Sequence, residues 1–578
     1  MRDGAKSKLM KSVEIATIFR DIAKILEIKG ENVFRVRAYE RAAQSVEDLP
    51  NLLEKYIKED RLQEIPGIGK ELAERIKEYS VTGKIKLFED LKKTIPPGLL
   101  ELLRIPSVGP KTAKLLFDRL KIKSIAGLEI AIQAKKLIGL PGIKEKTIEN
   151  IQKGIAIVKR GQERMTLAQA TAAALEFIEP LEKLPEVKKI STGGSLRRCK
   201  ETVRDIDILI ASDKPRETMR SFVKLPMVRD VTAEGDTKAS VRTKNDTQID
   251  CRVVADRSFG AALLYFTGSK DFNIKMRQLA IKKGLKINEY GIFRNDRFIC
   301  GKTEEEIFKT LGMSYIPPEL RENSGEIELA LKNKLPQLVT LKDILGDLHS
   351  HSTWSDGSNS IEEMAQAAVK LGYSYIAITD HSQSLKIANG LTPAELKKKK
   401  TEIEKINGKS KNFHILYGTE VDIDSQGNLD YPRKILAEFD IVIGAIHTGF
   451  KQSGAQISKR LICACKNKFV NIIAHPTGRL WGVREAFDLD MDEIFKAASG
   501  TKTSLEINSY PQRLDLNDSN CRRAKELGVK ISIGTDSHTV QQLQSMQLGI
   551  SVARRGWLTS KCVINTLPLE KLLKSIRK

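Results

Sequence analysis

Histidine is scarce in this sequence and is confined to one part of it. Only 7 of the 578 residues are histidine, and the first of them is His349. Imidazole is the commonest side chain that binds metal ions in proteins. The distribution therefore separates a metal-poor N-terminal part from a C-terminal part with different chemistry.

Cysteine pairs and long apolar runs are lacking as well. The 7 cysteines are an odd number without a C-x-x-C spacing, which argues against a disulfide framework and against a zinc ribbon. No apolar run approaches the roughly 20 residues of a membrane span, and the N-terminus lacks the apolar core of a signal peptide. We expect a soluble, cytoplasmic protein without a membrane partner.

The chain is long and strongly basic. Its mass of 64.6 kDa is too large for one hydrophobic core, so several domains are expected. The 97 Lys and Arg residues exceed the 74 Asp and Glu residues, which gives a net charge of +23. Such a charge suits a polyanionic partner such as nucleic acid, and with it a place at the nucleoid, but charge alone does not name the partner, since basic chains also bind acidic lipid.

Residues 1 to about 160 have helical periodicity and no convincing strand. A turn of Pro, Gly and small residues between two helical stretches occurs three times, in LQEIPGIGKELAERI, LLRIPSVGPKTAKLL and LIGLPGIKEKTIENI. Each copy is typical of a helix-hairpin-helix, in which Gly67, Gly69 and Gly109 let backbone amides face a DNA phosphate. An ordinary helical connector is the alternative. Lys144 occupies the second glycine position of the third copy, so that copy is not assigned a phosphate.

Strands alternate with helices from about residue 170. In DIDIL, Asp205 and Asp207 lie two residues apart on a predicted strand, so both carboxylates point to one face. Asp250, in QIDCRVV, lies on another strand and can join them. Three such carboxylates can hold two magnesium or manganese ions for phosphoryl transfer, although a lone D-x-D is usually a solvated strand edge.

A glycine turn precedes these aspartates. The segment TGGSLRR contains Gly194 and Ser195 and is followed closely by Arg197 and Arg198. Backbone amides at the start of a helix and nearby guanidinium groups both bind phosphate. The segment therefore predicts a triphosphate-binding turn beside the metal site.

These motifs, with the later YFTGSKDFNIKMR, closely resemble the X family of DNA polymerases over about residues 1 to 318. The resemblance implies that Asp205, Asp207 and Asp250 are catalytic and bind Mg²⁺ or Mn²⁺. It implies that gapped or nicked double-stranded DNA and deoxynucleoside triphosphates are the partners. It also implies the following nucleotide-binding residues: Gly194, Ser195 and Arg198 at the triphosphate, Tyr265 and Phe266 at the sugar, Gly268 in the same motif, Asn273 at the base and Arg277 at the template strand.

The N-terminal part departs from the family pattern at one position. Beta-type members have a lysine that forms a Schiff base where this chain has Arg75. Guanidinium stays protonated and forms imines poorly, so 5′-deoxyribose phosphate lyase activity is not predicted. Lys70 can substitute only through a different geometry. Arg35, Arg37 and Tyr39 are expected to bind a 5′-phosphate, unless they are part of a solvated helix face.

After a polar stretch that we expect to be a linker, seven strand-like segments alternate with helical ones. This repeat predicts a (β/α) barrel with polar residues at the C-terminal ends of its strands, where barrel enzymes have their active sites. Such a cluster is hard to satisfy without metal, although one such histidine alone is often a core residue. The candidate ligands are His349, His351, Asp356, His381, Glu420, His447, His475, Asp536 and His538.

The C-terminal segments, from DLHSHSTWSDG to GTDSH, resemble the polymerase and histidinol phosphatase (PHP) domain over about residues 341 to 578. Their mixed nitrogen and oxygen ligands favour manganese, zinc or iron, and close-spaced metals hydrolyse phosphoesters. The resemblance implies three ions: the first on His349, His351, Glu420 and Asp536, the second on Glu420, His447 and His475, and the third on Asp356, His381 and His538.

Three other features near these segments have simpler interpretations. Arg479 is a candidate phosphate contact or a surface residue, and His414 is expected to be structural. The LKKKK run at 396–400 is expected to be a solvated helix face.

The predicted architecture has all-α helix-hairpin-helix domains, an α+β nucleotidyltransferase palm and thumb, and a distorted (β/α)7 PHP barrel. The predicted function is a monomeric repair polymerase that fills short gaps, with 3′-5′ exonuclease or abasic-site endonuclease activity in the PHP domain. A 3′-end-processing nuclease with weak polymerase activity and a gapped-DNA scaffold are the alternatives. The predicted domains are 1–85 (N-terminal DNA-binding), 86–160 (fingers-type), 161–255 (palm), 256–318 (thumb), 319–340 (linker) and 341–578 (PHP).

Overall fold

The N-terminal part of the chain is helical. The structure, a computed structural model, describes residues 3–47, 53–65, 67–95, 98–103, 105 and 108–578. The first nine helices share one apolar cluster that includes Phe19, Ile76 and Leu128, so the two predicted helix-hairpin-helix domains pack together. Their bounds are α1 (Asp3–Lys29), α2 (Val33–Glu47), α3 (Leu53–Lys58), α4 (Lys70–Thr82), α5 (Lys86–Lys93), α6 (Leu99–Leu102), α7 (Pro110–Leu120), α8 (Ile125–Gln133) and α9 (Glu145–Glu163).

A five-stranded sheet follows, in the order β2-β4-β7-β6-β5. Strands β4 and β7 are parallel, and the other neighbours are antiparallel. A two-stranded ribbon of β1 (Met165–Thr166) and β3 (Thr202–Val203) lies outside this sheet. The strands of the sheet are β2 (Val187–Thr192), β4 (Asp205–Ser212), β5 (Val228–Glu234), β6 (Lys238–Thr243) and β7 (Gln248–Val254).

Helices cover both faces of this sheet. Ile206, Ile208 and Ile210 of β4 pack in one cluster with residues of α10 (Leu167–Glu182) and α12 (Pro215–Val223). Leu209 packs on the opposite face with α13 (Phe259–Thr267). Because side chains alternate along a strand, Asp205 and Asp207 lie on the α13 face.

The thumb consists of helices and a small antiparallel sheet, in the order β10-β9-β8. A capping box, in which Thr303 and Glu306 each bond the other's backbone amide, starts its helix α15. Its elements are α14 (Lys270–Lys282), β8 (Lys286–Asn288), β9 (Gly291–Arg294), β10 (Arg297–Cys300) and α15 (Glu304–Thr310).

The segment 319–340, expected to be a polar linker, packs as an extension of the thumb. It contains α16 (Glu326–Leu331), and Ile327 and Leu338 join the apolar cluster of the thumb. Arg321 is fully buried, where its Nη2 donates to Glu304 Oε2 at 3.1 Å. Part of the polar composition of this segment therefore reflects buried ion pairs, whereas residues 331–334 are exposed to solvent.

The C-terminal part is a barrel of seven parallel strands, in the order β11 to β17. The segments that follow β11 and β17 also meet, since the amide of His351 donates to the carbonyl of Ser537 at 2.8 Å. The predicted seven-stranded (β/α) barrel is confirmed. Its strands are β11 (Gly346–Asp347), β12 (Tyr375–Ile378), β13 (His414–Asp422), β14 (Ile441–Ala445), β15 (Ile472–Ile473), β16 (Ser504–Asn508) and β17 (Ile531–Gly534).

The barrel has an inner and an outer apolar layer. Tyr375 and Ile443 pack inside with Leu572 of the C-terminal helix, whereas Ile376 packs outside with the surrounding helices. The C-terminal helix is α24 (Leu569–Ile576), and the surrounding helices are α17 (Ile361–Lys370), α18 (Pro393–Asn407), α19 (Arg433–Leu436), α20 (Gly454–Lys466), α21 (Met491–Thr501), α22 (Asp518–Glu526) and α23 (Met546–Arg555).

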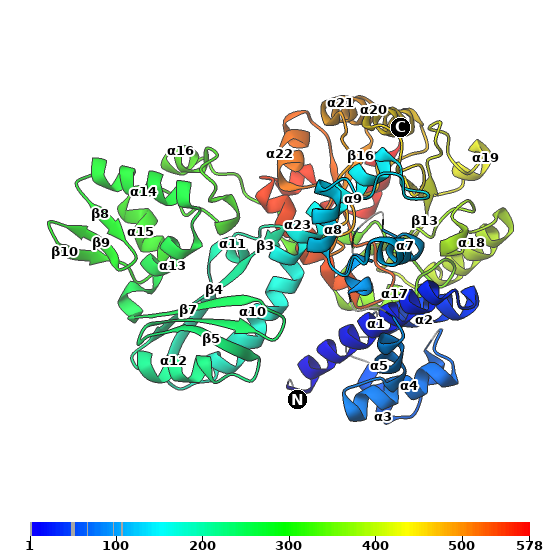
Figure 1. Ribbon diagram of the computed structural model, residues 1–578. Helices are drawn as coiled ribbons and strands as arrows, with labels where there is room; N and C mark the ends of the chain where they lie inside the picture. Colours follow the sequence, from blue (N-terminus) through cyan, green and yellow to red (C-terminus); the bar gives the residue numbers. More distant parts are fainter. Residues whose placement is uncertain (1–2, 48–52, 66, 96–97, 104, 106–107) are drawn as a thin grey trace.

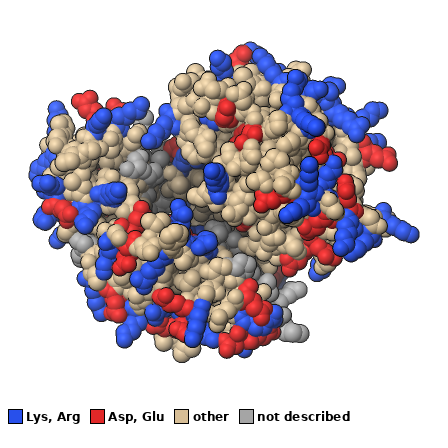
Figure 2. Space-filling view, turned by 90° about the vertical axis from the view of Figure 1, so that its right-hand side faces the viewer, with Lys and Arg blue, Asp and Glu red and all other residues tan. Residues whose placement is uncertain are grey.

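The palm and thumb lie on one side of the molecule and the barrel on the other (Figure 1). Ion pairs join the two sides: Arg554 Nε lies 2.7 Å from Glu319 Oε1, and Arg555 Nη1 lies 3.1 Å from Glu322 Oε1. Lys and Arg side chains are spread over the face in Figure 2 rather than gathered in one patch. Among the described helices, none combines the length and apolarity of a membrane span.

Candidate active sites

The three aspartates of the palm lie on adjacent strands. Asp205 and Asp207 are on β4, and Asp207 pairs in register with Asp250 of β7. Burial, followed by the negative charges of Asp205 and Asp250, raises the pKa of Asp207 to about 6. Mutual repulsion of this kind is relieved by a cation, so the arrangement suits a divalent metal.

The Asp250 carboxylate is also bonded within the sheet. Gln248 Nε2 donates to its Oδ2 at 3.0 Å, and the Ser240 hydroxyl donates to its Oδ1. Arg204 Nη2 lies 3.5 Å from Asp205 Oδ2. The contacts from Gln248 and Ser240 fix the orientation of Asp250, whereas the Asp205 side chain is 38% exposed.

The predicted glycine turn packs against the aspartates. It leads into α11 (Gly194–Arg197), and Gly194 has φ +57 with its α-carbon hydrogen directed at Asp207 Oδ2. A side chain there would collide with that carboxylate, which accounts for glycine. Ser195 lies in the same turn, next to the metal-binding face.

Arg198, expected to hold the triphosphate, makes ion-pair and backbone contacts in this structure. Its Nε donates to Glu322 Oε1 at 3.1 Å, and its Nη1 donates to the carbonyl of Thr267 at 2.5 Å. Arg197 instead forms a buried pair with Glu304, with Nη2 at 2.7 Å from Oε2. Both arginines are therefore tied to the thumb.

The predicted sugar and base contacts line the thumb side of the site. The rings of Tyr265 and Phe266 meet edge to face with centroids 5.1 Å apart. Asn273 Nδ2 donates to the carbonyl of Tyr265 at 2.7 Å, and Arg277 Nε donates to the carbonyl of Asn273 at 3.4 Å. Gly268, with φ +69, follows at the end of α13. Tyr265, Asn273 and Arg277 line one small pocket, and Phe266 lines another with Asp207 and Asp250.

The hairpin glycines of the N-terminal part lie at helix starts. Gly67 has φ +81, and Gly69 and Gly109 precede the first turns of α4 and α7. In the third copy Lys144 takes the equivalent place before α9. The backbone amides of these first turns have no partner within their helices, so they can face a phosphate.

The expected 5′-phosphate residues do not all converge. Arg35 Nη2 lies 3.9 Å from Glu71 Oε1, and the hydroxyl of the buried Tyr39 donates to the same oxygen at 3.3 Å. Arg37 is exposed on α2. Arg75 lies 3.3 Å from Glu78, through Nη1 and Oε2. Arg35 and Tyr39 therefore meet at a carboxylate that a phosphate has to displace.

The nine candidate ligands of the barrel gather at the carboxyl ends of its strands. His349 and His351 follow β11, His381 follows β12, and Glu420 lies in β13. Three groups have ligand atoms within 4.8 Å of one another: His351, Asp356, His381 and His538; His349, His351 and Asp536; His381, Glu420 and His447.

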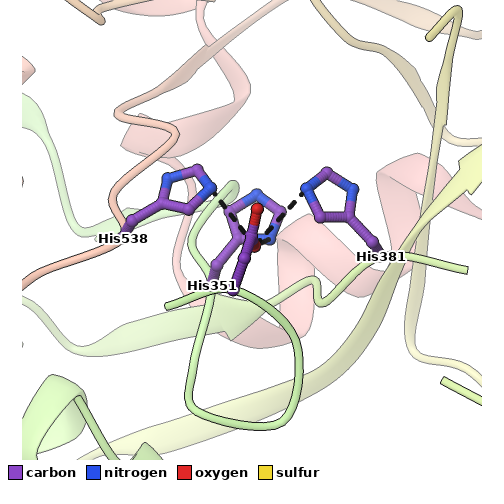
Figure 3. Close-up of side chains that lie close together, drawn as sticks. His351, His381 and His538 are labelled. Carbon is purple, nitrogen blue, oxygen red and sulfur yellow. Dashed lines mark ion pairs between the residues drawn. The ribbon is translucent and has the colours of Figure 1, made fainter. Parts of the chain in front are cut away.

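These contacts are short and mostly buried. His351 Nε2 lies 3.2 Å from Asp536 Oδ1, and His475 Nε2 lies 3.0 Å from Glu420 Oε1. His381 and His538 approach Asp356 Oδ1 at 3.6 and 3.4 Å. Figure 3 shows His351, His381 and His538 turned toward one another. The grouping differs from the expected one in detail, because His351 and His381 each belong to two groups.

The histidines have opposite electrostatic environments. Burial, followed by the positive charges of His538 and His381, lowers the pKa of His351 to about 4. Burial also opposes protonation of His447, but Glu420 and a hydrogen bond to Asp422 outweigh it and raise the pKa to about 10. Burial likewise opposes protonation of His538, but the hydrogen bond and negative charge of Asp356 outweigh it and raise the pKa of His538 to about 9.

The donor set fits divalent metal ions. The buried Nδ1 of His351 has no hydrogen-bond partner among the residues that the structure describes, and His381 Nδ1 lies 2.9 Å from Glu420 Oε2 without the angle of a hydrogen bond. Neutral imidazoles and carboxylates that face one another in this way are the ligands of manganese and zinc.

Comparison with known proteins agrees with this arrangement. A Bacillus subtilis protein described as a DNA polymerase/3′-5′ exonuclease PolX is 41% identical over 565 residues, which are 97% of this chain and 98% of that protein. This chain belongs to the same family, the X family of DNA polymerases with a C-terminal PHP domain.

Matches to family models follow the same division of the chain. They are a helix-hairpin-helix domain at 10–85, a SAM-like helix-hairpin-helix tandem at 99–156, a DNA polymerase beta thumb at 262–322 and a PHP domain at 347–509. A probable phosphatase of Thermoanaerobacter sp. is 33% identical over 38% of this chain and 89% of its own length. DNA polymerase lambda of Rattus norvegicus is 25% identical over 52% of this chain and 54% of its own.

Carboxylates that orient the histidines of this PHP domain were not predicted. Glu506 Oε1 lies 2.7 Å from His349 Nδ1, and Asp422 Oδ1 lies 2.6 Å from His447 Nδ1. Such partners fix the ring orientation of a metal-binding histidine. The one available signal was their place in predicted strands close to the expected ligands.

Two expectations for this PHP domain need correction. Arg479 is neither a surface residue nor a phosphate contact here, because its Nη1 pairs with Glu201 of the palm at 2.9 Å and its Nε donates to the carbonyl of Arg513. The LKKKK run is not wholly solvated, because Lys399 is fully buried and its Nζ lies 2.9 Å from Asp380 Oδ2. His414 begins β13, away from the carboxyl ends.

Proposed function

We propose that this protein is a DNA polymerase that fills short gaps in damaged DNA and removes nucleotides or blocking groups from 3′ ends through its PHP domain. The main support is the presence of two separate groups of metal-ligand side chains in one chain. One is made of aspartates on an open sheet, and the other of histidines and carboxylates in a barrel.

In the polymerase site, Asp205, Asp207 and Asp250 would hold Mg²⁺ or Mn²⁺. When bound, these ions activate the primer 3′-hydroxyl and stabilise the leaving pyrophosphate. Gly194 and Ser195 present the turn to the triphosphate.

Arg198 has to share its guanidinium between Glu322 and the incoming triphosphate. Tyr265 and Phe266 offer flat faces for the sugar. Asn273 and Arg277 extend toward the base and the template strand.

In the PHP site, the nine barrel residues would hold up to three Mn²⁺ or Zn²⁺ ions. When bound, such ions supply a hydroxide nucleophile and stabilise charge on the phosphate. Glu506 and Asp422 keep the imidazoles of His349 and His447 in their ligand orientation. His349 and His351 are fully buried, whereas Asp356 and His538 remain partly exposed, so the site is open to substrate on their side.

The proposed substrates are gapped or nicked double-stranded DNA and deoxynucleoside triphosphates, bound by a monomer in the cytoplasm at the nucleoid. The helix-hairpin-helix regions would bind the backbone through the turns at Gly67, Gly69 and Gly109, without reading sequence. Abasic-site cleavage by the PHP domain is a further proposed activity. Lyase activity is not proposed, because Arg75 cannot form an imine readily.

A gapped duplex labelled at the primer 5′ end tests this function. The protein and its Asp205→Ala and His349→Ala variants are incubated with manganese, with and without deoxynucleotides. We expect extension to be lost only in the aspartate variant, and shortening only in the histidine variant. Shortening without extension in the unmodified protein favours the nuclease alternative, and neither reaction favours the scaffold.

A further inference from the structure

An arginine without an assigned role lies beside the candidate metal ligands of the barrel. Arg513 follows β16, and its Nε lies 3.5 Å from Asp536 Oδ2. Its side chain is only 15% exposed, and its Nη1 is buried without a hydrogen-bond partner among the described residues. A buried guanidinium donor left unbonded is costly, so a ligand that accepts its hydrogen bond is expected.

Asp536 does not satisfy this guanidinium. Its Oδ1 faces His351 Nε2 at 3.2 Å, and its Oδ2 accepts a hydrogen bond from Asn508 Nδ2 at 3.0 Å. Oδ1 is thus turned toward the candidate ligand groups, whereas Oδ2 faces Asn508 and, at the longer distance of 3.5 Å, Arg513. Metal ions at the candidate ligands would add positive charge beside Arg513. The repulsion between these ions and the guanidinium would make a bound anion more favourable in the metal-loaded site than in the metal-free one.

A second guanidinium lies on the segment that borders Arg513, where the amide of Trp481 donates to the carbonyl of Gln512 at 2.8 Å. Burial, followed by the positive charge of Arg513, lowers the pKa of Arg484 to about 10. Arg484 lies over the ring of Phe450 at 4.1 Å, and its Nε donates to the carbonyl of Gly478 at 2.6 Å. Two like charges beside one site repel each other, and a bound anion compensates that repulsion.

Two other largely buried arginines of this region have protein partners for their guanidinium groups. Arg479 is bonded to Glu201 and to two backbone carbonyls, and Arg555 is bonded to Asp518 and Glu322. Arg513 therefore stands out among them as a buried guanidinium that has both an unbonded donor and a candidate metal ligand at its side.

We propose that Arg513 binds a phosphate group in the PHP site, with Arg484 adding positive charge to the same wall. The ligand class is a phosphodiester or terminal phosphate, since its oxygens accept paired N–H donors from a guanidinium. This inference rests on the proposed phosphoesterase function and adds a substrate-binding residue to it. Arg513 holds the phosphate on the side of Asp536 opposite His351.

Four full-length, manganese-loaded proteins test the proposal: the unmodified chain, Arg513→Met, Arg513→Lys and Arg523→Gln. Arg523 is the matched control, because it is a barrel arginine that pairs with Asp492 on the exposed surface. Bound metal is measured by elemental analysis. Binding of radiolabelled orthophosphate is measured by equilibrium dialysis, and KM and kcat are measured for shortening of an oligonucleotide 3′ end.

We expect Arg513→Met to keep its bound metal and to lose about 10- to 100-fold in phosphate affinity, as for a charge-assisted hydrogen bond. Arg513→Lys should lose less, and Arg523→Gln should not change. A rise in oligonucleotide KM together with the loss of orthophosphate affinity indicates a phosphodiester ligand. A change for orthophosphate alone indicates a site for the free phosphate product.

Two results would overturn the proposal. Unchanged phosphate affinity in Arg513→Met shows that Arg513 binds no phosphate. Loss of metal in parallel with phosphate shows that Arg513 only supports Asp536. If the unmodified chain binds no metal and shortens no oligonucleotide, the proposed PHP function itself fails, which is a different outcome from either of these.

Discussion

The two groups of metal-ligand residues differ in how far the fold assembles them before any ligand binds. In the palm, Asp205 and Asp207 remain partly exposed on the sheet. In the barrel, His349, His351 and Glu420 are almost fully buried, and their ring and carboxylate atoms already meet within 4 Å. The palm site therefore depends on substrate to complete it, whereas the barrel site is preorganised and depends on metal to neutralise its charges.

The sharpest test of this difference removes one carboxylate from the palm. Asp207→Asn should reduce primer extension about a thousandfold, since a carboxylate on a catalytic metal contributes about 4 kcal/mol to transition-state stabilisation. Shortening of the 3′ end should not change. Both are measured on the labelled gapped duplex.

Asp213→Asn is the control, because Asp213 is an exposed aspartate at the end of the same strand region and pairs with Lys188. The metal-free Asp207→Asn protein should also unfold at a slightly higher temperature, because burial and repulsion already raise the pKa of Asp207. A parallel loss of extension and shortening would contradict the independence of the two sites.

The corresponding change in the barrel is Glu420→Gln. Glu420 lies within 4 Å of five histidines, including His447 and His475. Its loss should remove bound manganese and reduce shortening more than about 100-fold, because even indirect partners of metal ligands cost 10- to 100-fold. Elemental analysis and the shortening assay measure the two effects.

Extension by Glu420→Gln should stay at the unmodified level. Glu438→Gln is the matched control, because Glu438 is an exposed barrel glutamate paired with Lys400. Retention of all metal by Glu420→Gln would show that the barrel does not need this central carboxylate.

The unfolding temperature of the metal-free barrel, measured in chelator at a series of pH values, should further distinguish the barrel site from the palm site. The pKa values of His447 and His538 are raised to about 10 and about 9, against about 6.5 for an unfolded histidine. Their contribution to stability is therefore complete below pH 6.5 and is lost as pH rises through 9 to 10. The metal-free barrel should unfold at progressively lower temperature over this range.

Manganese should reverse this trend, because metal binding displaces the protons of His447 and His538 and becomes tighter as pH rises. At a free metal concentration of about 1,000 times Kd the gain is about 4 kcal/mol. Calorimetry with and without manganese measures both slopes. Equal slopes in the two conditions would show that these histidines do not bind the metal.

The sequence allowed prediction of those features that depend on local patterns. Six of the seven barrel strands, all except β16, carry or lead directly into a candidate ligand, so His381 and Glu420 could be assigned from residue order alone. Lys399, Arg321 and Arg479 were misassigned because their partners, Asp380, Glu304 and Glu201, come from other elements. In the local sequence, a charged residue that is buried in an ion pair with a distant segment cannot be told from one that is exposed to solvent.

The smallest expected effect concerns the contact between the two regions. Glu322 Oε1 lies 3.1 Å from both Arg198 Nε of the palm and Arg555 Nη1 of the barrel. Glu322→Gln should release Arg198 for the triphosphate and lower the KM for deoxynucleotides about two- to fivefold, as for one partly buried ion pair. Arg555 keeps Asp518 as a partner, so the fold should be retained.

Steady-state gap filling measures this KM, with Glu319→Gln as the control. Glu319 pairs with Arg554 across the same boundary but does not contact Arg198. If both variants lower KM equally, the effect comes from loosening the boundary in general. If only Glu322→Gln does so, one carboxylate links nucleotide binding in the exposed site to the scaffold of the buried one, and the two regions are independent in chemistry but not in structure.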